Sequence, residues 1–481
     1  MSATGFGILS FGAYLPRARL QRKAIAAANS WFAPGLRSLA KGERAMCNWD
    51  EDSITMGVEA ARDCLSGLDR GSLAQLVLAS TTHPFDDRQN AGVVANALQL
   101  PSSLRATDAA GGLRAGSSAL AAALESRAGP TLVIAADSRK SKCGSVQEMH
   151  YGDGAAAMLV GHGDPIARLI GSHSETVDFV HQYRMHDKAH DYAWEERWVR
   201  DEGYLKIVPR AVEALLGSSK VDAAKVTHFC MPGTLSRIAA TVAKRCGLPD
   251  GAVRDNLAAV CGDTGAAHPL LLLAAALEGA KPGELILLAA FGEGCDALLF
   301  EVTPAISNPS LRQGVKGALA AKREDSNYMR YLSFNNLLDM ERGMRAEPDK
   351  PTQMTVLYRN RDMVQGLIGG KCRKCGTVQY PSQRYCVNPE CNALDSQDDY
   401  AFAERSGTVM SYTADALTYS PDPPTYFGMV QFDGGGRMLM DFSEIEADKI
   451  DVGLPVRMVF RIKDADTMRG FVRYFWKATP A

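Results

Sequence analysis

Two stretches of the chain repeat the same order of apolar and polar segments within the first 300 or so residues. In each stretch an apolar run, a helical pattern, a small-residue turn, a second helical pattern and a second apolar run follow one another. The apolar runs lie at 76–83 and 131–136 in the first stretch, and at 226–232 and 284–290 in the second. Apolar runs joined by helices are typical of parallel strands covered on both faces. Each stretch is therefore expected to fold as strand, helix, strand, helix, strand.

The second helical pattern of each stretch contains the segment Ala-Ala-Ala-Leu-Glu, at 121–125 and at 274–278. Counting back from these segments, Leu113 corresponds to Ala266, and His268 lies two residues beyond Ala266. Two such copies packed face to face form an α/β core with α-β-α-β-α layers, and ligands then meet at helix amino termini between the copies. We assign the copies to residues 1–165 and 166–305. The alternative is that the two Ala-rich helices are unrelated.

The pattern changes after about residue 305. Residues 306–365 contain amphipathic helical patterns and a segment rich in proline and charge at 347–351, which indicates a helical linker. Residues 399–481 contain short strands separated by Gly, Pro and Asp turns, which predicts a small β-barrel of the OB type. Between them, residues 366–398 contain a cluster of cysteines.

The spacing of these cysteines is that of a metal site. Two residues separate the first pair, ten separate the two pairs, and four separate the second pair; the cysteines are Cys372, Cys375, Cys386 and Cys391. Four thiolates are the soft tetrahedral set that zinc prefers, and a site made of four cysteines is structural because it leaves no position for water. A rubredoxin-like iron site uses the same ligands. We expect a structural zinc ribbon.

Composition narrows the possible partners and compartment. The chain has 481 residues, a net charge of −2, and 46% hydrophobic and 22% charged residues, which fits about two to four ordinary globular domains. The charge gives no reason to expect nucleic acid or a membrane surface as a partner. Residues 4–16 are apolar but lack a basic leader and a cleavage site, and no run of about 18 apolar residues exists. With the other seven cysteines scattered singly, we expect a cytoplasmic protein without a membrane span.

Residues 4–303 resemble 3-hydroxy-3-methylglutaryl-CoA synthase of the thiolase superfamily, and residues from about 330 to 479 resemble the zinc-ribbon and OB-fold proteins that accompany thiolase-like enzymes. The motifs that carry the first resemblance are 49–61, 108–120 and 151–161, and those that carry the second are 369–376 and 453–460. The resemblance implies an acyl-CoA substrate, with CoA as part of substrate or product, and a homodimer.

The chain departs from this family at the catalytic positions. Family synthases use a Glu, a Cys and a His, and the matching positions here are Thr81, Leu113 and Cys230. A further Asn of the family is replaced by Asp263. A leucine cannot carry an acyl group, so the usual acyl-cysteine cannot form at this position.

One segment indicates that the site has gained a different catalytic residue. Gly265-Ala-Ala-His268-Pro resembles the Gly-His-Pro of degradative thiolases, whose histidine serves in the active site. We expect His268 to act as base or oxyanion donor, with Cys230 and Asp263 lining the same cavity; the alternative is that His268 only packs at a helix start. The residues expected to line the substrate pocket are Thr81, His83, Leu113 and Arg114, with Arg114 as a candidate for CoA phosphate.

The expected reaction is retro-Claisen cleavage of a β-ketoacyl-CoA, more readily by water than by a thiol. Three alternatives remain: Cys230 as a relocated nucleophile, a condensing or thiolytic acyltransferase like the family synthase, and a non-catalytic acyl-CoA-binding scaffold. The stretch 172–204, rich in His, Tyr, Trp and Arg, is either a cap over the active-site mouth or a surface or dimer contact.

Overall fold

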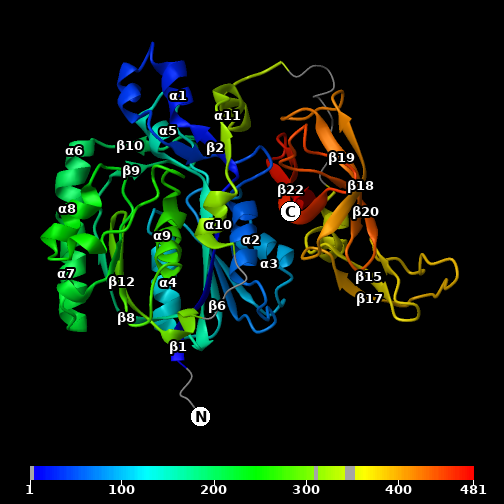
Figure 1. Ribbon diagram of the computed structural model, residues 1–481, viewed down its shortest axis with the longest axis horizontal. Coiled ribbons are helices and arrows are strands. Elements are labelled where there is room, and N and C mark those ends of the chain that lie inside the picture. Colours follow the sequence, from blue (N-terminus) through cyan, green and yellow to red (C-terminus); the bar gives the residue numbers. More distant parts are fainter. Residues whose placement is uncertain (1–4, 308–312, 342–352) are drawn as a thin grey trace. The chain divides into compact units, whose positions relative to one another are not determined.

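The computed structural model describes residues 5–307, 313–341 and 353–481 (Figure 1). They form two compact units. The first comprises Met1–Cys47, Asp52–Gly92 and Leu100–Leu337, and the second comprises Asn48–Glu51, Val93–Gln99 and Leu338–Ala481. The segment 347–351, expected to belong to a linker, lies outside the described residues. Within the described ranges no helix has the length and apolarity that a membrane crossing requires.

The first unit is built on nine strands in the order β11-β12-β13-β8-β1-β7-β6-β4-β5. The first copy supplies β1 (Gly5–Tyr14), β4 (Gln75–Ala79), β5 (Arg105–Ala109), β6 (Thr131–Asp137) and β7 (Gly154–Gly163). The second supplies β8 (Ala167–Thr176), β11 (His228–Cys230), β12 (Leu285–Phe291) and β13 (Gly294–Val302). The order β4, β6, β7, β1 thus mirrors β11, β12, β13, β8, and the copies join where Ile8 pairs with Ala167. The duplicated α/β core expected from the sequence is confirmed.

The middle strand of the second copy differs from the expectation. In the first copy β5 pairs in parallel with β4. Its counterpart is a single parallel bridge between Phe229 and Val253. Polar side chains turn the chain away immediately afterwards, because Asp255 accepts from the backbone N–H of Leu257 at 2.9 Å and Asn256 donates to the carbonyl of Gly233 at 2.8 Å. Such local bonds compete with a strand ladder.

Helices cover both copies and fill the space between them. α2 (Ser53–Cys64) packs on β1, β6 and β7, and α7 (Ile207–Ser219) packs on β8, β12 and β13. α4 (Ala115–Ser126) and α9 (His268–Leu277) contact each other; α4 packs on β6 and α9 on both β7 and β12. Figure 1 shows α4 and α9 in the centre, between the strands of the two copies. This is the α-β-α-β-α layering of the expected fold.

The remaining helices and short strands of this unit lie at its periphery. The helices are α1 (Arg22–Asn29), α5 (Val146–His150), α6 (Glu196–Trp198), α8 (Ile238–Arg245), α10 (Gly314–Ala320) and α11 (Tyr328–Phe334). α3 (Asn90–Ala97) begins in this unit, and its residues from Val93 on belong to the second. The strands are β2 (Ala18–Gln21), β3 (Glu43–Ala45), β9 (Gln182–Tyr183), β10 (Tyr192–Ala193) and β14 (Arg323–Asp325). β14 pairs in parallel with β2. The part of the expected linker up to Leu337 therefore belongs to the first unit.

The second unit combines a small three-stranded sheet with a five-stranded one. The three-stranded sheet has the order β16-β15-β17, and the five-stranded sheet has the order β20-β19-β18-β21-β22. Their strands are β15 (Ile368–Cys372), β16 (Val378–Gln379), β17 (Gln397–Ala401), β18 (Gly407–Asp415), β19 (Thr425–Phe432), β20 (Arg437–Asp441), β21 (Pro455–Asp466) and β22 (Phe471–Pro480), preceded by the helices α12 (Met354–Arg359) and α13 (Arg361–Val364). A bridge between Phe442 and Ala478 curves the larger sheet toward closure, as in an OB fold.

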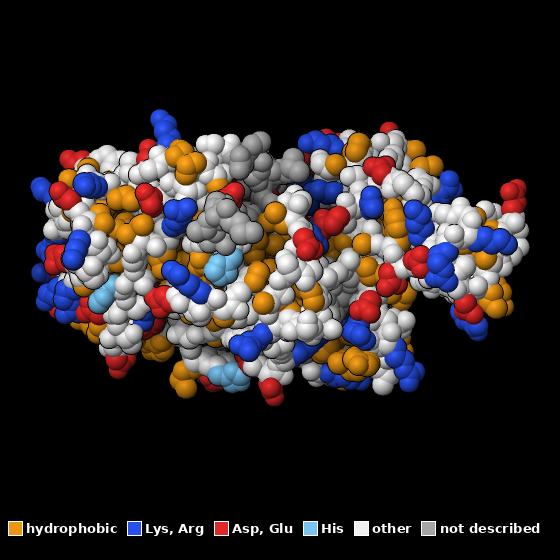
Figure 2. All heavy atoms as spheres, turned by 90° about the horizontal axis from the view of Figure 1, so that it is seen from below, with side chains coloured by type: hydrophobic (Ala, Val, Ile, Leu, Met, Phe, Trp, Pro, Cys, Tyr) orange, Lys and Arg blue, Asp and Glu red, His pale blue; other side chains and the backbone are white. Residues whose placement is uncertain are grey.

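Charged side chains of both signs are interspersed over the face that Figure 2 shows. Their mixture agrees with the net charge of −2 over the whole chain. Single apolar side chains lie among them, as on most protein surfaces.

A close approach at Gly116 sets the distance between α4 and the start of α9. A Cβ atom on Gly116 would lie 2.4 Å from the carbonyl oxygen of Ala266 and 2.9 Å from the Cβ of Ala135. No side chain fits there without moving backbone, so the two copies meet at a residue without a side chain.

We expect Gly116→Ala to lower the free energy of unfolding by about 1–3 kcal/mol, because the added methyl group overpacks this contact. Gly217→Ala is the matched control, since Gly217 lies in α7 and a Cβ there would have nothing within 4 Å. That control should be stabilised by about 0.5–1 kcal/mol through helix propensity. Urea unfolding of both variants tests the pair, and equal stability changes would contradict the close approach.

Candidate active site and metal centre

A buried carboxylate joins the two copies where β6 ends. Asp137 accepts hydrogen bonds from Ser80 Oγ at 2.9 Å, Thr81 N at 2.7 Å, Thr81 Oγ1 at 2.9 Å and Thr82 Oγ1 at 3.1 Å. It also accepts from the backbone N–H of Ala266 in the second copy at 2.7 Å. The Thr81 hydroxyl, expected in the substrate pocket, therefore donates to Asp137. The loop after β4 and the start of α9 are fixed to each other through this side chain.

Asp263 forms an ion pair beside this carboxylate. Its Oδ1 lies 3.1 Å from Arg139 Nη2 and accepts from the backbone N–H of Gly265 at 2.9 Å. The Arg139 guanidinium also lies over the ring of Tyr151, 3.8 Å from its centroid. Burial raises the pKa of Asp263, but Arg139, His268 and the hydrogen bond from Gly265 together outweigh burial and hold that pKa below the ordinary value. Asp263 is thus an ionised partner of Arg139.

His268 is buried and both of its ring nitrogens are used. Nδ1 accepts from the backbone N–H of Thr264 at 3.1 Å, and Nε2 donates to the carbonyl of Asn256 at 2.8 Å. Burial lowers the pKa of His268, which keeps the imidazole neutral. Neither expected role, as base or as oxyanion donor, agrees with this geometry, because no lone pair or N–H is left for a substrate. The ring instead positions the loop before α9.

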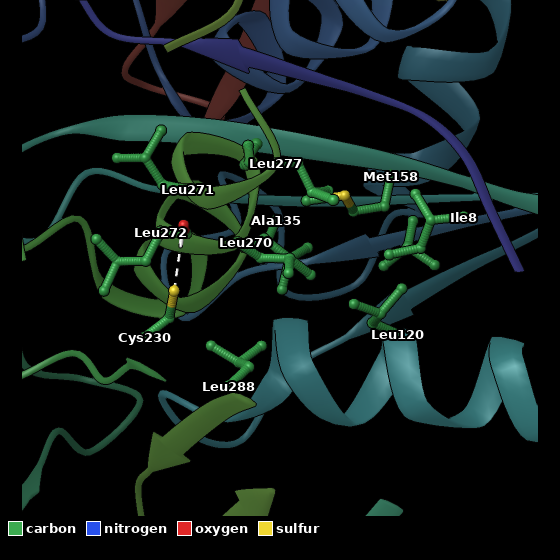
Figure 3. Close-up of a cluster of buried hydrophobic side chains, with 14 of the residues drawn as sticks. Ile8, Leu120, Ala135, Met158, Cys230, Leu270, Leu271, Leu272, Leu277 and Leu288 are labelled. Carbon is green, nitrogen blue, oxygen red and sulfur yellow. Dashed lines mark hydrogen bonds between the residues drawn. The ribbon is translucent and has the colours of Figure 1, made fainter. Parts of the chain in front are cut away.

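Cys230 belongs to the apolar core. It is the last residue of β11, is fully buried, and its Sγ lies 3.6 Å from the carbonyl oxygen of Leu272 (Figure 3). Figure 3 shows Leu272 and Leu288 beside it. Burial raises the pKa of the Cys230 thiol to about 12. Both features disfavour the alternative of Cys230 as a relocated nucleophile, since a reactive cysteine needs exposure and a lowered pKa.

Leu113 lies in the loop that leads into α4, against the turn between β12 and β13. A Cβ on Gly292 of this turn would lie 3.2 Å from the Cβ of Leu113. The next residue, Arg114, pairs with Asp296 at 2.8 Å and donates to the carbonyls of Gly292 at 2.5 Å and Glu293 at 3.0 Å. The expectation that Arg114 binds CoA phosphate does not agree with these contacts, because its guanidinium holds the turn.

Sequence reasoning missed two acid–base groups at the same loop. The Glu293 carboxylate reaches over Gly112, since a Cβ on Gly112 would lie 2.5 Å from Glu293 Oε2. The other oxygen, Oε1, lies 3.8 Å from Nδ1 of the buried His181. Burial raises the pKa of Glu293 and lowers that of His181 to about 4. No motif marks either residue; the only signal was the richness of 172–204 in histidine and aromatic residues.

The middle of the stretch 172–204 lies against the ends of the first copy's strands, whereas residues 172–176 belong to β8 and residues 199–204 pack on α7 and α8. Arg184 donates to the carbonyl of Thr81 and pairs with Asp191 at 2.6 Å. Beside Thr81, His83 Nε2 lies 3.3 Å from the carbonyl oxygen of Ala109 at the end of β5. The structure therefore brings this stretch, Thr81, His83 and Leu113 to the loops at one edge of the sheet, while Cys230 and the His268 ring are turned into the interior.

The four late cysteines converge. Their sulfur atoms all lie within 4.8 Å of one another, with 3.9 Å between Cys372 and Cys391 and 3.4 Å between Cys375 and Cys386. An ion with Zn–S bonds of about 2.3 Å in a tetrahedron needs sulfurs roughly 3.8 Å apart, so the set fits zinc. A hydrogen bond with Ser396 lowers the pKa of Cys372 to about 6, which favours the thiolate. Four sulfurs leave no coordination position for a substrate.

Three protein families match parts of the chain. Residues 216–301 match 3-oxoacyl-[acyl-carrier-protein] synthase III, C terminal. Residues 361–395 match the rubredoxin-like zinc ribbon domain of ChsH2, and residues 400–461 match the C-terminal OB-fold domain of ChsH2. The expected fusion of a thiolase-like core with a zinc ribbon and an OB fold is confirmed, and the ribbon match supports a structural zinc.

Curated relatives and solved structures match the core. Hydroxymethylglutaryl-CoA synthase from Aeropyrum pernix is 30% identical over 313 residues, covering 62% of this chain and 86% of that protein. The enzyme of that name from Pyrococcus furiosus is 28% identical over 308 residues, covering 62% and 85%. A crystal structure of HMG-CoA synthase complexed with CoA has a TM-score of 0.61 at 17% identity, covering 73% of this chain and 95% of that one. OleA from Xanthomonas campestris has a TM-score of 0.55 at 16% identity, covering 62% and 98%. The two structures show a shared fold.

Iodoacetamide should leave Cys230 unmodified in the native protein and modify Cys143, which is exposed. With its pKa raised to about 12, Cys230 is almost entirely protonated at neutral pH, and burial also excludes the reagent. Peptide mass spectrometry after native labelling checks this. Rapid labelling of Cys230 that an acyl-CoA prevents would restore it as a nucleophile candidate.

The second prediction concerns the metal. Elemental analysis of the purified chain should find one zinc per chain, and Cys386→Ser should lose it and unfold the ribbon, because metal binding and folding are coupled in such sites. Cys143→Ser, which alters a cysteine outside the cluster, should keep the zinc. Iron in place of zinc, or full zinc content in Cys386→Ser, would show that the site has been misassigned.

Proposed function

Because this chain belongs to the hydroxymethylglutaryl-CoA synthase family of the thiolase superfamily, we propose that it acts on the carbon–carbon bond beside the carbonyl of an acyl-CoA without forming an acyl-cysteine. The observation that carries the proposal is Leu113. It occupies the loop into α4, where the family nucleophile would stand, and its side chain has no group to which an acyl fragment can be attached. The loss of the cysteine thus removes the covalent step and leaves the frame around it.

The reaction that fits this frame is hydrolytic cleavage of a β-ketoacyl-CoA. Water adds to the β-carbonyl carbon, the bond between the α- and β-carbons breaks, and its electron pair passes to the α-carbon as a thioester enolate. A proton then returns to the α-carbon. The products are a carboxylic acid and a shorter acyl-CoA such as acetyl-CoA, and one water is consumed.

The frame favours the enolate more than it favours an acyl-enzyme. The amino-terminal end of α4 lies between the copies, and a helix start supplies N–H donors and a positive dipole end to an oxyanion. Electrostatic stabilisation of this kind is usually the largest part of catalysis. A covalent cysteine chiefly allows a second thiol to release the fragment later, so water can replace it.

Condensation is the second candidate, because the curated relatives are named as synthases. Condensation and cleavage share a transition state, so the same groups serve either direction. A thiolytic acyltransferase differs in its acceptor, which would be CoA in place of water. The presence of free CoA in the assay therefore separates the two cleavage reactions.

The direct test is to incubate a panel of β-ketoacyl-CoA substrates in heavy-oxygen water, with and without free CoA. We expect one labelled oxygen in the carboxylic acid and no dependence on free CoA. An unlabelled product that requires CoA would replace hydrolysis by thiolysis. A chain that binds acyl-CoA but turns over no member of the panel in either direction would support the scaffold alternative.

A variant tests the position of Leu113. Leu113→Cys should become acylated by acetyl-CoA, seen as a gain of one acetyl group in the intact mass, because the thiol would lie at the start of α4. Cys230→Ser, at the buried cysteine, is the control and should gain nothing. If Leu113→Cys stays unacylated although it is folded and binds acetyl-CoA, the loop is not the reaction centre.

A further inference from the structure

We propose that His181 and Glu293 form the acid–base pair that moves the proton between water and the α-carbon of the acyl-CoA at the loop before α4. This deepens the proposed function and rests on it. Neither residue occupies a position that the departures at Thr81, Leu113 and Cys230 would indicate, and the two lie 112 positions apart in the chain.

The Glu293 carboxylate is held in place from several sides. Glu293 has a positive φ of 45°, a conformation that residues with a side chain rarely adopt. Arg114 binds the carbonyl of Glu293 at 3.0 Å and pairs with the buried Asp296, which also accepts from Ser117 at 2.7 Å and Ser174 at 2.8 Å. A non-glycine residue kept in this conformation by a buried network indicates that its side chain is used there.

The residue after Glu293 has no room for a side chain. A Cβ on the next residue, Gly294, would lie 1.9 Å from the carbonyl oxygen of Glu175. The carboxylate consequently projects toward the loop before α4, with Oε2 against Gly112 and Oε1 toward His181. Its side chain is still 35% exposed, so a ligand can reach it.

His181 differs from the other buried histidines of the unit. Its side chain is only 9% exposed, and within the described ranges neither ring nitrogen has a partner with regular hydrogen-bond geometry, although the backbone of Phe179 lies close enough to raise the pKa of the ring. By contrast, His268 uses both nitrogens, and His228 bonds Glu284 at 2.8 Å. A buried imidazole with both nitrogens unpaired is costly, and such groups are rare in folded proteins unless a ligand or water completes them. Its neighbour Glu293 reaches the loop that contains Leu113, so we infer that a ligand bound at this loop completes the hydrogen bonding of the imidazole.

Burial favours the neutral form of the His181 imidazole at rest. Burial lowers the pKa of His181 to about 4, and the nearby Arg139 acts in the same direction, while Asp263 opposes it. Burial also raises the pKa of Glu293, as does Asp178, while Arg114 opposes it. A neutral imidazole can accept a proton, and the carboxylate 3.8 Å away can stabilise the imidazolium that results.

These two side chains account for each proton transfer that the reaction requires. The imidazole of His181 takes one proton from water as the water oxygen bonds to the β-carbonyl carbon. The carbon–carbon bond breaks toward the α-carbon, and the imidazolium returns the proton to the enolate. Glu293 remains a carboxylate throughout, and the pair ends as it began. By microscopic reversibility, the same pair removes an α-proton from the product acetyl-CoA.

That reverse half-reaction provides the test. Acetyl-CoA is incubated with enzyme in deuterium oxide, and exchange of its methyl protons is followed by NMR or mass spectrometry. His181→Gln and Glu293→Gln should each slow the exchange by about 100-fold or more, the usual range for a lost acid–base group. The double variant should lose little beyond either single one, because the groups act as a unit.

Glu284→Gln is the matched control. Glu293 follows the strand β12, and Glu284 lies immediately before the other end of that strand. Glu284 also pairs with a histidine, His228. That change should leave exchange unaltered, since the pair there lies away from the loop before α4. Glu293→Gln keeps the test available if His181→Gln does not fold, because the Glu293 side chain is partly exposed and Gln has the same shape.

The outcomes separate the two proposals. Full exchange in both folded variants, or no exchange by the unmodified enzyme, overturns the assignment of the pair. Exchange that depends on His181 and Glu293, with no cleavage or condensation of any substrate, supports the pair and overturns the proposed function. Cleavage by the unmodified enzyme, together with unchanged exchange in both variants, supports the proposed function and overturns the assignment of the pair.

Discussion

The architecture of the site depends on one buried carboxylate. Asp137, at the end of a strand of the first copy, accepts from the loop after β4 and from the backbone of Ala266, which begins the central helix region of the second copy. A carboxylate with 0% exposure is stable only when such donors satisfy it. The positions of Thr81, of the start of α9 and of the neighbouring ion pair between Arg139 and Asp263 therefore follow from this residue. A duplicated fold needs a fixed contact of this kind where its halves meet.

The catalytic positions of the family have been converted into structural ones. Cys230 fills the apolar core, and the Thr81 hydroxyl donates to Asp137. Each replacement removes a reactive group and adds a satisfied contact. Two groups with unpaired ring nitrogens or a shifted pKa, His181 and Glu293, lie on the stretch 172–204 and on the turn between β12 and β13. We propose these elements as the reaction centre within a retained frame.

The fold and the metal cluster could be predicted from the sequence because both depend on residue patterns within short segments. The repeated apolar runs and Ala-Ala-Ala-Leu-Glu segments indicate the two copies, and the spacing from Cys372 to Cys391 indicates the ribbon. The pairing of His181 with Glu293 could not be predicted, because it depends on how a long insertion lies against a turn far along the chain. The bonding of His268 could not be predicted for a related reason: its spacing resembles a catalytic motif, but its hydrogen bonds to Thr264 and Asn256 are a tertiary feature. The shortened middle strand of the second copy likewise follows from the side chains of Asp255 and Asn256.

The central claim is that this frame handles an acyl-CoA carbonyl without ever linking the fragment to the protein. Intact-mass spectrometry on enzyme that is acid-quenched during turnover of acetoacetyl-CoA tests it most directly. We expect the quenched enzyme to have the mass of the unmodified chain at every time point while product accumulates. An acyl adduct that forms and decays at the rate of turnover, on any side chain, would contradict it.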